Sequence, residues 1–169
     1  MRERRQQCSS RMRIVLDTNV VLSALLWTGT PHHLLQAIGR QRATVQLYSS
    51  TALIEELANV LGRPSAASRL ALIGQSARQT VADYIDVVEL VAPVSVPRVV
   101  PDDADDDHVI AAALAAQADL IVSGDRHLLS IGHHQGVAIV MARGDRTGRS
   151  LNSPSAKERS ATAQSSYLR

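Results

Sequence analysis

Apolar residues along this chain alternate between two periods, one typical of strands and one typical of helices. Short apolar runs with polar ends predict strands at residues 14–16, 43–50, 118–125 and 136–142, with a further short strand within 87–94. Helical periodicity fills the intervals, at residues 20–27, 32–40, 52–64, 65–74, 75–90, 106–118 and 126–131. Strands that alternate with helices predict an α/β fold. We expect a three-layer sandwich, in which helices flank a central parallel sheet of four to five strands.

Charge divides the chain into a core and two basic ends. Residues 13–143 carry nine Arg against thirteen acids, whereas residues 1–12 and 144–169 each have a net charge of about +3. Both ends are poor in apolar residues, so we predict a flexible basic segment at 1–12, one folded domain at 13–143 and a flexible basic tail at 144–169. The single Cys8 excludes a disulfide framework and favours a reducing, cytoplasmic setting. No apolar run approaches 18 residues, so we expect no membrane span.

Two predicted strands end in an acid. Asp17 follows the run Ile14–Leu16, and Asp125 follows LIVSG. In an open parallel sheet the functional crevice lies beyond the carboxyl ends of the strands, so both acids are candidates for one site.

A helical wheel selects a third acid in ALIEELANVL. With Leu57 at about 0° and about 100° per residue, Glu56 lies near −100°, beside the apolar stripe, and Glu55 lies near 160°. We therefore expect Glu56 to point inward and Glu55 to face solvent.

The stretch PDDADDDHVI places five carboxylates in six positions ahead of an apolar helix. On a wheel, Asp106 and Asp107 lie on either side of the stripe of Ile110, while His108 points away. The helix dipole stabilises one or two acids in a first turn, by about 0.3–1 kcal/mol each, but explains five poorly.

Carboxylates from four segments would repel one another unless a cation lay between them. Their oxygen ligands suit Mg²⁺ or Mn²⁺ better than zinc, so the pattern indicates a metal site, with solvated helix-capping acids as the alternative. The chain has no G-x-G-x-x-G motif and no P-loop. It also lacks the paired Asp of the haloacid-dehalogenase phosphatases, because Asn19 stands two residues after Asp17.

Three blocks, MRIVLDTNVVLSALLW, SSTALIEELANVLGRP and PDDADDDHVIAAALAAQADLIVSGDRHLLSI, together resemble the PIN-domain family. The resemblance spans about Met12 to Ala142 and is greatest to the VapC-like toxins of toxin–antitoxin systems. It implies a small α/β ribonuclease with an acidic site dependent on Mg²⁺ or Mn²⁺. By this resemblance Asp17 is the first acid, Glu56 the second and Asp125 the last, and Asn19 and Ser123 occupy supporting polar positions.

The resemblance leaves the third acid open. A D-x-x-D-x-x-x-L pattern aligns with Asp103, Asp106 and Ile110, whereas the D-x-x-I-A spacing selects Asp107. We favour Asp106 as catalytic and retain Asp107 as a metal ligand, with Asp103 in support.

The expected function is therefore a metal-dependent endoribonuclease that acts as a toxin. Its expected partners are an RNA substrate, a cognate antitoxin protein and a second copy of the chain in a homodimer. The alternative is a catalytically inactive PIN-like module that binds RNA or an antitoxin. A complete set of acids favours catalysis.

Overall fold

The computed structural model describes residues 11–95, 98–99 and 104–142. At residues 104 and 105 it describes the backbone alone. The predicted flexible ends, residues 1–12 and 144–169, fall almost entirely outside the described residues, so the domain boundaries stay predictions. Asp102 and Asp103 also lie outside the described residues, and the side chain of Asp105 is not described.

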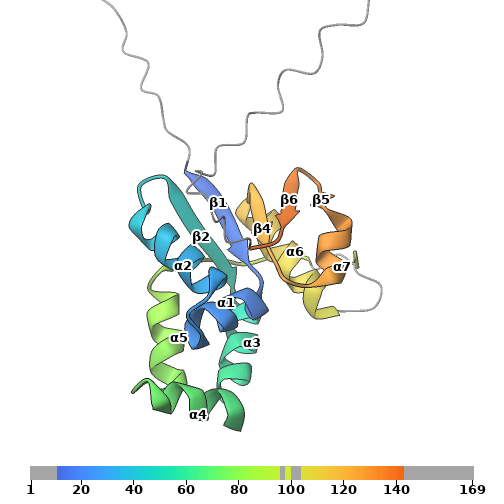
Figure 1. The fold of residues 1–169 in the computed structure, drawn as a ribbon. Coiled ribbons are helices and arrows are strands. Elements are labelled where there is room, and N and C mark those ends of the chain that lie inside the picture. The colour runs from blue at the N-terminus through green and yellow to red at the C-terminus, as the bar shows by residue number, and fades with distance from the viewer. Residues whose placement is uncertain (1–10, 96–97, 100–103, 143–169) are drawn as a thin grey trace, which may run out of the picture.

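Strands and helices alternate along the chain as the periodicity predicts (Figure 1). The strands are β1 Met12–Leu16, β2 Val45–Ser50, β3 Val88–Val91, β4 Leu120–Val122, β5 His133–His134 and β6 Val137–Val140. The helices are α1 Thr18–Leu26, α2 Thr30–Arg40, α3 Thr51–Leu61, α4 Pro64–Leu72, α5 Ala77–Ile85, α6 Ala104–Ala116 and α7 Arg126–Ile131.

The strands form a sheet with the order β3-β2-β1-β4-β6-β5. Every pairing is parallel except that of β5 with β6, which is antiparallel. The chain leaves β1 toward β2 and β3, and later returns to the other side of β1 with β4. This reversal of strand order makes the gap between β1 and β4 the topological switch point, where open parallel sheets bind their ligands.

The sheet confirms the predicted parallel α/β architecture and adds one short strand at its edge. His133 and His134 form β5, which lies between the helix predicted at 126–131 and the strand predicted at 136–142. Gln135 and Gly136 turn this hairpin with φ of 45° and 92°. Two successive residues with positive φ are the requirement of a type I′ turn. A two-residue strand is too short to show a period in the sequence.

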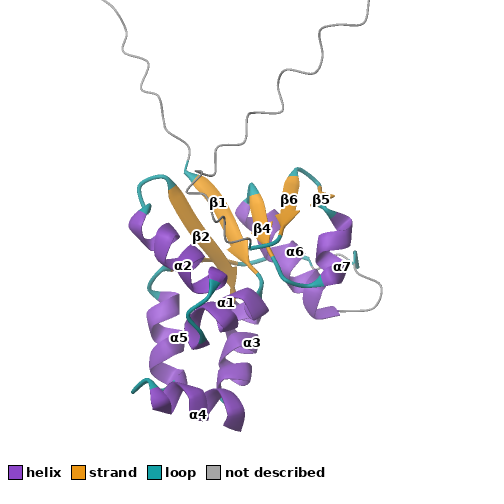
Figure 2. Ribbon diagram, in the orientation of Figure 1, coloured by secondary structure: helices purple, strands orange, loops and turns teal. Residues whose placement is uncertain are grey.

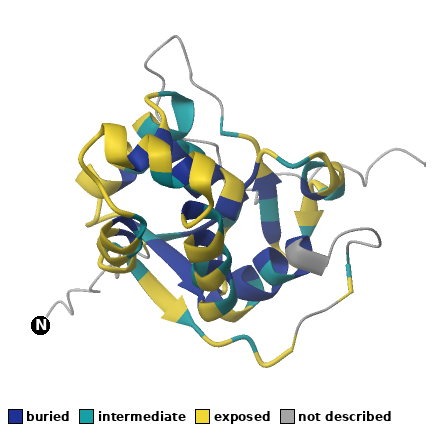
Figure 3. Cartoon of the chain, turned by 90° about the horizontal axis from the view of Figure 1, so that it is seen from below, coloured by how far each residue is buried: buried dark blue, intermediate teal, exposed yellow. Residues whose placement is uncertain are grey.

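Two hydrophobic clusters cover opposite faces of the sheet and make the three layers visible in Figure 2. Successive residues of β1 divide between them, because side chains alternate across a strand. Ile14 and Leu16 pack into the cluster built by helices α1 to α5, whereas Val15 packs into the cluster of α6 and α7. Figure 3 shows the buried residues gathered along the strands and the inner sides of the helices. Among the described residues, no helix is long and apolar enough to cross a membrane.

Helix α6 packs on the sheet through small side chains. Ala112, Ala113 and Ala116 are fully buried, whereas Ala115 on the same helix is exposed. Small residues let the helix backbone approach β1 and β2 closely, and so hold the amino-terminal acids of α6 against the sheet.

Replacing Ala113 with leucine tests this close packing. Overfilling a well-packed core costs about 1–3 kcal/mol, so Ala113→Leu should lower the free energy of unfolding by that amount in urea denaturation. Ala115→Leu makes the same chemical change on the exposed face and should alter it by no more than about 0.5 kcal/mol. Equal losses in both variants would contradict the packing described here.

Candidate active site at the carboxyl ends of the strands

Asp17 lies where β1 ends and α1 begins. Its backbone N–H continues the sheet by donating to the carbonyl of Val122 at 2.9 Å. Its side chain is only 4% exposed and caps α1, because Oδ1 accepts the backbone N–H of Asn19 at 3.2 Å. A carboxylate at a helix amino terminus is favoured by the free N–H groups and by the helix dipole. The first predicted acid is therefore held at the switch point.

Ser123 joins the ends of the two central strands. The residue is fully buried, directly after β4, and its Oγ donates to Asp17 Oδ2 at 2.6 Å. The same oxygen accepts the backbone N–H of Asp125 at 2.9 Å. One hydroxyl therefore fixes the Asp17 carboxylate and the start of the Asp125 turn together, across 106 residues of sequence.

Asp125 is the half-buried cap of α7. Its Oδ1 accepts the backbone N–H of His127 at 2.6 Å, so Asp125 caps the amino terminus of α7 in the same way as Asp17 caps α1. His127 and Arg126 are both exposed. Helix capping is thus a sufficient structural reason for an acid at each strand end, whatever else these carboxylates do.

Glu56 reaches the same region from α3. Thr18 Oγ1 donates to Glu56 Oε2 at 2.7 Å, and Thr18 directly follows Asp17. Glu56 is half-buried and Glu55 exposed, in agreement with the helical wheel. Thr18, only 4% exposed, is a site residue that the sequence reasoning missed. In the sequence, Thr18 is recognisable only as a hydroxyl residue next to an acid at a strand end. That position does not reveal its hydrogen bond to Glu56, 38 residues away.

Asp106 and Asp107 are both buried in the first turns of α6, at 7% and 1% exposure, while His108 is half-buried. Asp107 Oδ1 accepts the backbone N–H of Val99 at 2.9 Å, which fastens the segment before the helix to its first turns. Helix α6 packs against β1, β2 and β4. Both acids are buried, in agreement with the wheel, so burial alone does not choose between them. Asp103 lies outside the described residues.

A pocket of about 330 Å³ opens beside this network. Its wall combines the start of α1, the turn after β4 and the chain after β6, and the polar residues in it are Asn19, Ser23, Ser123 and Asp125. Asn19 is exposed, so its amide is available to a ligand in the pocket. Both predicted supporting residues therefore line the pocket, but Asn19 is exposed there, whereas Ser123 is buried and also donates to Asp17.

The acids that the structure describes do not form a closed metal cage. Within the part of the chain that the structure describes, no group of three or more His, Cys, Asp or Glu side chains is placed to hold a metal ion. The donor set is nevertheless made of carboxylate, hydroxyl and amide oxygens, which suit a hard divalent cation. Mg²⁺ commonly takes only one or two protein carboxylates and completes its octahedron with water and phosphate oxygens. The donor chemistry thus fits Mg²⁺ or Mn²⁺ in an open site.

Comparison with known proteins agrees with the fold and the motifs. No curated protein matches the chain. Among solved structures, it is similar to a chain in the crystal structure of VapBC2 from Rickettsia felis bound to a DNA fragment from their promoter. The TM-score is 0.55 at 11% sequence identity, and the match covers 77% of this chain and 98% of that chain. The model of the PIN domain matches residues 13–127, which include the candidate acids Asp17, Glu56, Asp106, Asp107 and Asp125. With most of its length matched in this way, the chain belongs to the PIN-domain family.

Proposed function

We propose that this protein is a metal-dependent endoribonuclease that hydrolyses RNA phosphodiester bonds. The observation that carries the proposal is the buried Ser123 hydroxyl, which binds Asp17 and the Asp125 backbone at the switch point of the sheet. Membership of a family whose members are generally nucleases supports the same function. Glu56 adds a third acid through its hydrogen bond to Thr18, the neighbour of Asp17.

The proposed cofactor is Mg²⁺ or Mn²⁺, held by Asp17, Glu56, Asp125 and one or both of Asp106 and Asp107. When bound, such an ion polarises phosphate oxygens, lowers the pKa of water and stabilises the leaving oxygen. The open arrangement of the acids leaves coordination positions for water and for substrate phosphate.

Three polar side chains beside the acids, those of Ser123, Thr18 and Asn19, have distinct parts in the proposed reaction. Ser123 donates to Asp17 and so keeps that carboxylate oriented as an acceptor, and Thr18 does the same for Glu56. Asn19, exposed in the pocket wall, is placed to donate to a phosphate oxygen or a water. Hydrolysis adds water across a P–O bond, with one carboxylate receiving the proton of the attacking water, and no covalent enzyme intermediate forms.

We further propose that the enzyme is the toxin of a toxin–antitoxin pair, working in the cytoplasm as a homodimer that a cognate antitoxin protein restrains. The fold shared with a chain of the VapBC2 structure supports this setting. The single Cys8 is compatible with a reducing compartment.

A second candidate is an inactive PIN-like module that binds RNA or an antitoxin without cleaving. The observation in its favour is that three acids are not clustered tightly enough, among the described residues, to hold an ion on their own. Metal-dependent cleavage separates the two candidates.

The first prediction from the proposed function concerns activity. Purified protein incubated with a mixed pool of single-stranded and structured RNA should cleave it with Mn²⁺ or Mg²⁺ and stop in EDTA. Asp17→Asn should reduce the rate about a hundredfold or more, because a bound ion contributes several kcal/mol of charge stabilisation in the transition state. Asp83→Asn, an exposed change on α5, is the matched control and should leave cleavage intact. Cleavage that survives both EDTA and Asp17→Asn would exclude the proposed mechanism.

The second prediction separates the acids of α6. Asp106→Asn should abolish metal-dependent cleavage while leaving the fold intact. Asp107→Ala should chiefly lower stability, because it removes the Oδ1 that accepts the backbone N–H of Val99. The two variants are compared by RNA cleavage and by thermal unfolding. The reverse pattern would move the third catalytic role to Asp107.

The third prediction concerns Ser123. Ser123→Ala removes the donor to Asp17 and the acceptor for Asp125 N–H, so it should lower the free energy of unfolding by about 1–3 kcal/mol. Residues that orient ligand side chains typically account for a 10–100-fold effect on metal affinity, so Mn²⁺ binding should weaken by about that factor. Ser130→Ala, which removes an exposed hydroxyl that donates to the carbonyl of His127, should change neither quantity appreciably. Unaltered stability and Mn²⁺ affinity in Ser123→Ala would count against the network.

A further inference from the structure

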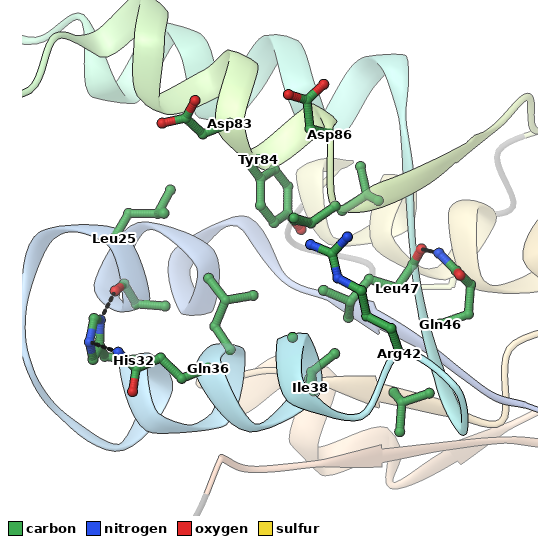
Figure 4. A pocket seen from close by; sticks show the side chains of 16 residues that line it. Leu25, His32, Gln36, Ile38, Arg42, Gln46, Leu47, Asp83, Tyr84 and Asp86 are labelled. Carbon is green, nitrogen blue, oxygen red and sulfur yellow. Dashed lines mark hydrogen bonds between the residues drawn. The ribbon is translucent and has the colours of Figure 1, made fainter.

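Helix α1 separates two cavities. The larger, of about 470 Å³, lies between α2 and α5, and Ala24 and Leu25 are the residues of α1 that line it (Figure 4). The Tyr84 hydroxyl in its lining is buried out of reach of solvent. This cavity shares no lining residue with the pocket of about 330 Å³ beside Asp17. A ligand that contacts the acids of the candidate site therefore lies on the other side of α1.

The pocket beside Asp17 has a mixed lining. Four lining side chains are polar and four are apolar, the latter being Val20, Pro31, Met141 and Ala142. Met141 is 48% exposed although it lines the pocket, so its side chain is open to contact. A nucleobase has the same division, because its faces are apolar and its edges carry hydrogen-bonding groups. The lining thus suits a nucleobase next to the proposed site of phosphodiester cleavage.

Ser23 offers a hydrogen bond inside this pocket. It is half-buried, and its hydroxyl makes no hydrogen bond within the described part of the chain. Unlike the Tyr84 hydroxyl, it is not sealed from solvent. Ser23 follows Asn19 by four residues on the same side of α1, about 6 Å along the axis. A nucleotide with its phosphate at Asn19 can therefore place its base at Ser23, with the ribose between them.

Trp27 continues the line of Asn19 and Ser23 along α1. Its backbone N–H donates to the carbonyl of Ser23 at 3.1 Å, so it lies one helical turn further on. It is the only tryptophan of the chain, and it is 51% exposed. Exposed aromatic rings hold unpaired bases by stacking, whatever the base. In a duplex the base faces are already stacked on their neighbours, so this contact selects an unpaired strand.

Arg69 brings a positive charge to the same end of α1. Its Nε donates to the carbonyl of Leu26 at 3.2 Å, which places its guanidinium beside the peptide bond that leads to Trp27. Arg69 is exposed, and the bond to Leu26 uses one of its five N–H donors. A cation next to a stacking ring is the combination with which proteins bind single strands of nucleic acid.

We propose that an unpaired RNA strand lies along α1. The base next to the scissile phosphate enters the pocket, where Ser23 bonds its edge and Met141 contacts its face. The following base stacks on Trp27, and its phosphate pairs with Arg69. This inference rests on the proposed nuclease function and specifies its substrate, which is RNA with unpaired nucleotides at the point of cleavage.

The single tryptophan makes the contact measurable without cleavage. The probe is a phosphorothioate RNA strand of about eight nucleotides, which resists hydrolysis, titrated into the full chain with Mg²⁺. The single strand should quench the fluorescence of Trp27 saturably, and the same strand annealed to its complement should bind at least about tenfold more weakly. By anisotropy of a labelled strand, Trp27→Ala should weaken binding about tenfold. Leu90→Ala, which removes an exposed apolar side chain on β3, is the control and should not.

Two further variants test the pocket and the charge. Ser23→Leu should fill the pocket and weaken binding about tenfold at an unchanged melting temperature, whereas Ala115→Leu on the exposed face of α6 should leave binding intact. Arg69→Gln should lower the slope of log affinity against log salt by about 0.7, as expected for one lost phosphate contact to a single strand. Arg78→Gln, an exposed change on α5, should leave the slope unaltered.

The outcomes separate this inference from the proposed function. Binding with quenching of Trp27 but no cleavage of ordinary RNA would support the strand path and refute the nuclease. Cleavage that Trp27→Ala and Ser23→Leu leave unchanged would keep the nuclease and overturn the strand path. Equal affinity for single strand and duplex, or no binding of the single strand, would also overturn it.

Discussion

The hydrogen bond from Ser123 to Asp17 is the interaction on which the candidate site depends. It joins the two strands at which the sheet reverses its order, and it is buried, so water does not compete for either partner. Through the same oxygen Ser123 also receives the N–H of Asp125. Two acids far apart in sequence are thereby placed by one short side chain, and Thr18 extends the arrangement to Glu56.

The carboxylates that cap helices of the fold are also the ones proposed to hold the metal ion. Asp17 and Asp125 each cap a helix that starts at a strand end, which is reason enough for an acid at both places. A metal site built from capping residues needs little extra structure, because the helix termini already orient the oxygens. This double use also explains why the described acids do not form a closed cluster: each is positioned by its own helix, and substrate phosphate would complete the coordination.

The sequence sufficed for features that depend on local pattern. Strand ends placed Asp17 and Asp125, and a helical wheel distinguished Glu56 from Glu55.

The sequence did not suffice for features that depend on how distant segments pair and pack. The bond of Ser123 to Asp17 depends on the pairing of β1 with β4, and the Thr18–Glu56 bond on how α3 packs beside α1. Asp106 and Asp107 flank one apolar stripe and are both buried, so neither pattern nor burial separates them. The Tyr84 hydroxyl, which has no partner among the described residues, likewise leaves no trace in the sequence.

The most direct test of the central claim is Mn²⁺ binding followed by the electron paramagnetic resonance of the free ion. It would be measured with and without a phosphorothioate RNA oligonucleotide that resists hydrolysis. The account predicts that the protein binds Mn²⁺, that RNA strengthens this binding, and that Asp17→Asn weakens it at least about tenfold. Absence of Mn²⁺ binding to the wild type at millimolar concentration, with or without RNA, would contradict a metal-dependent site and favour the inactive binding module.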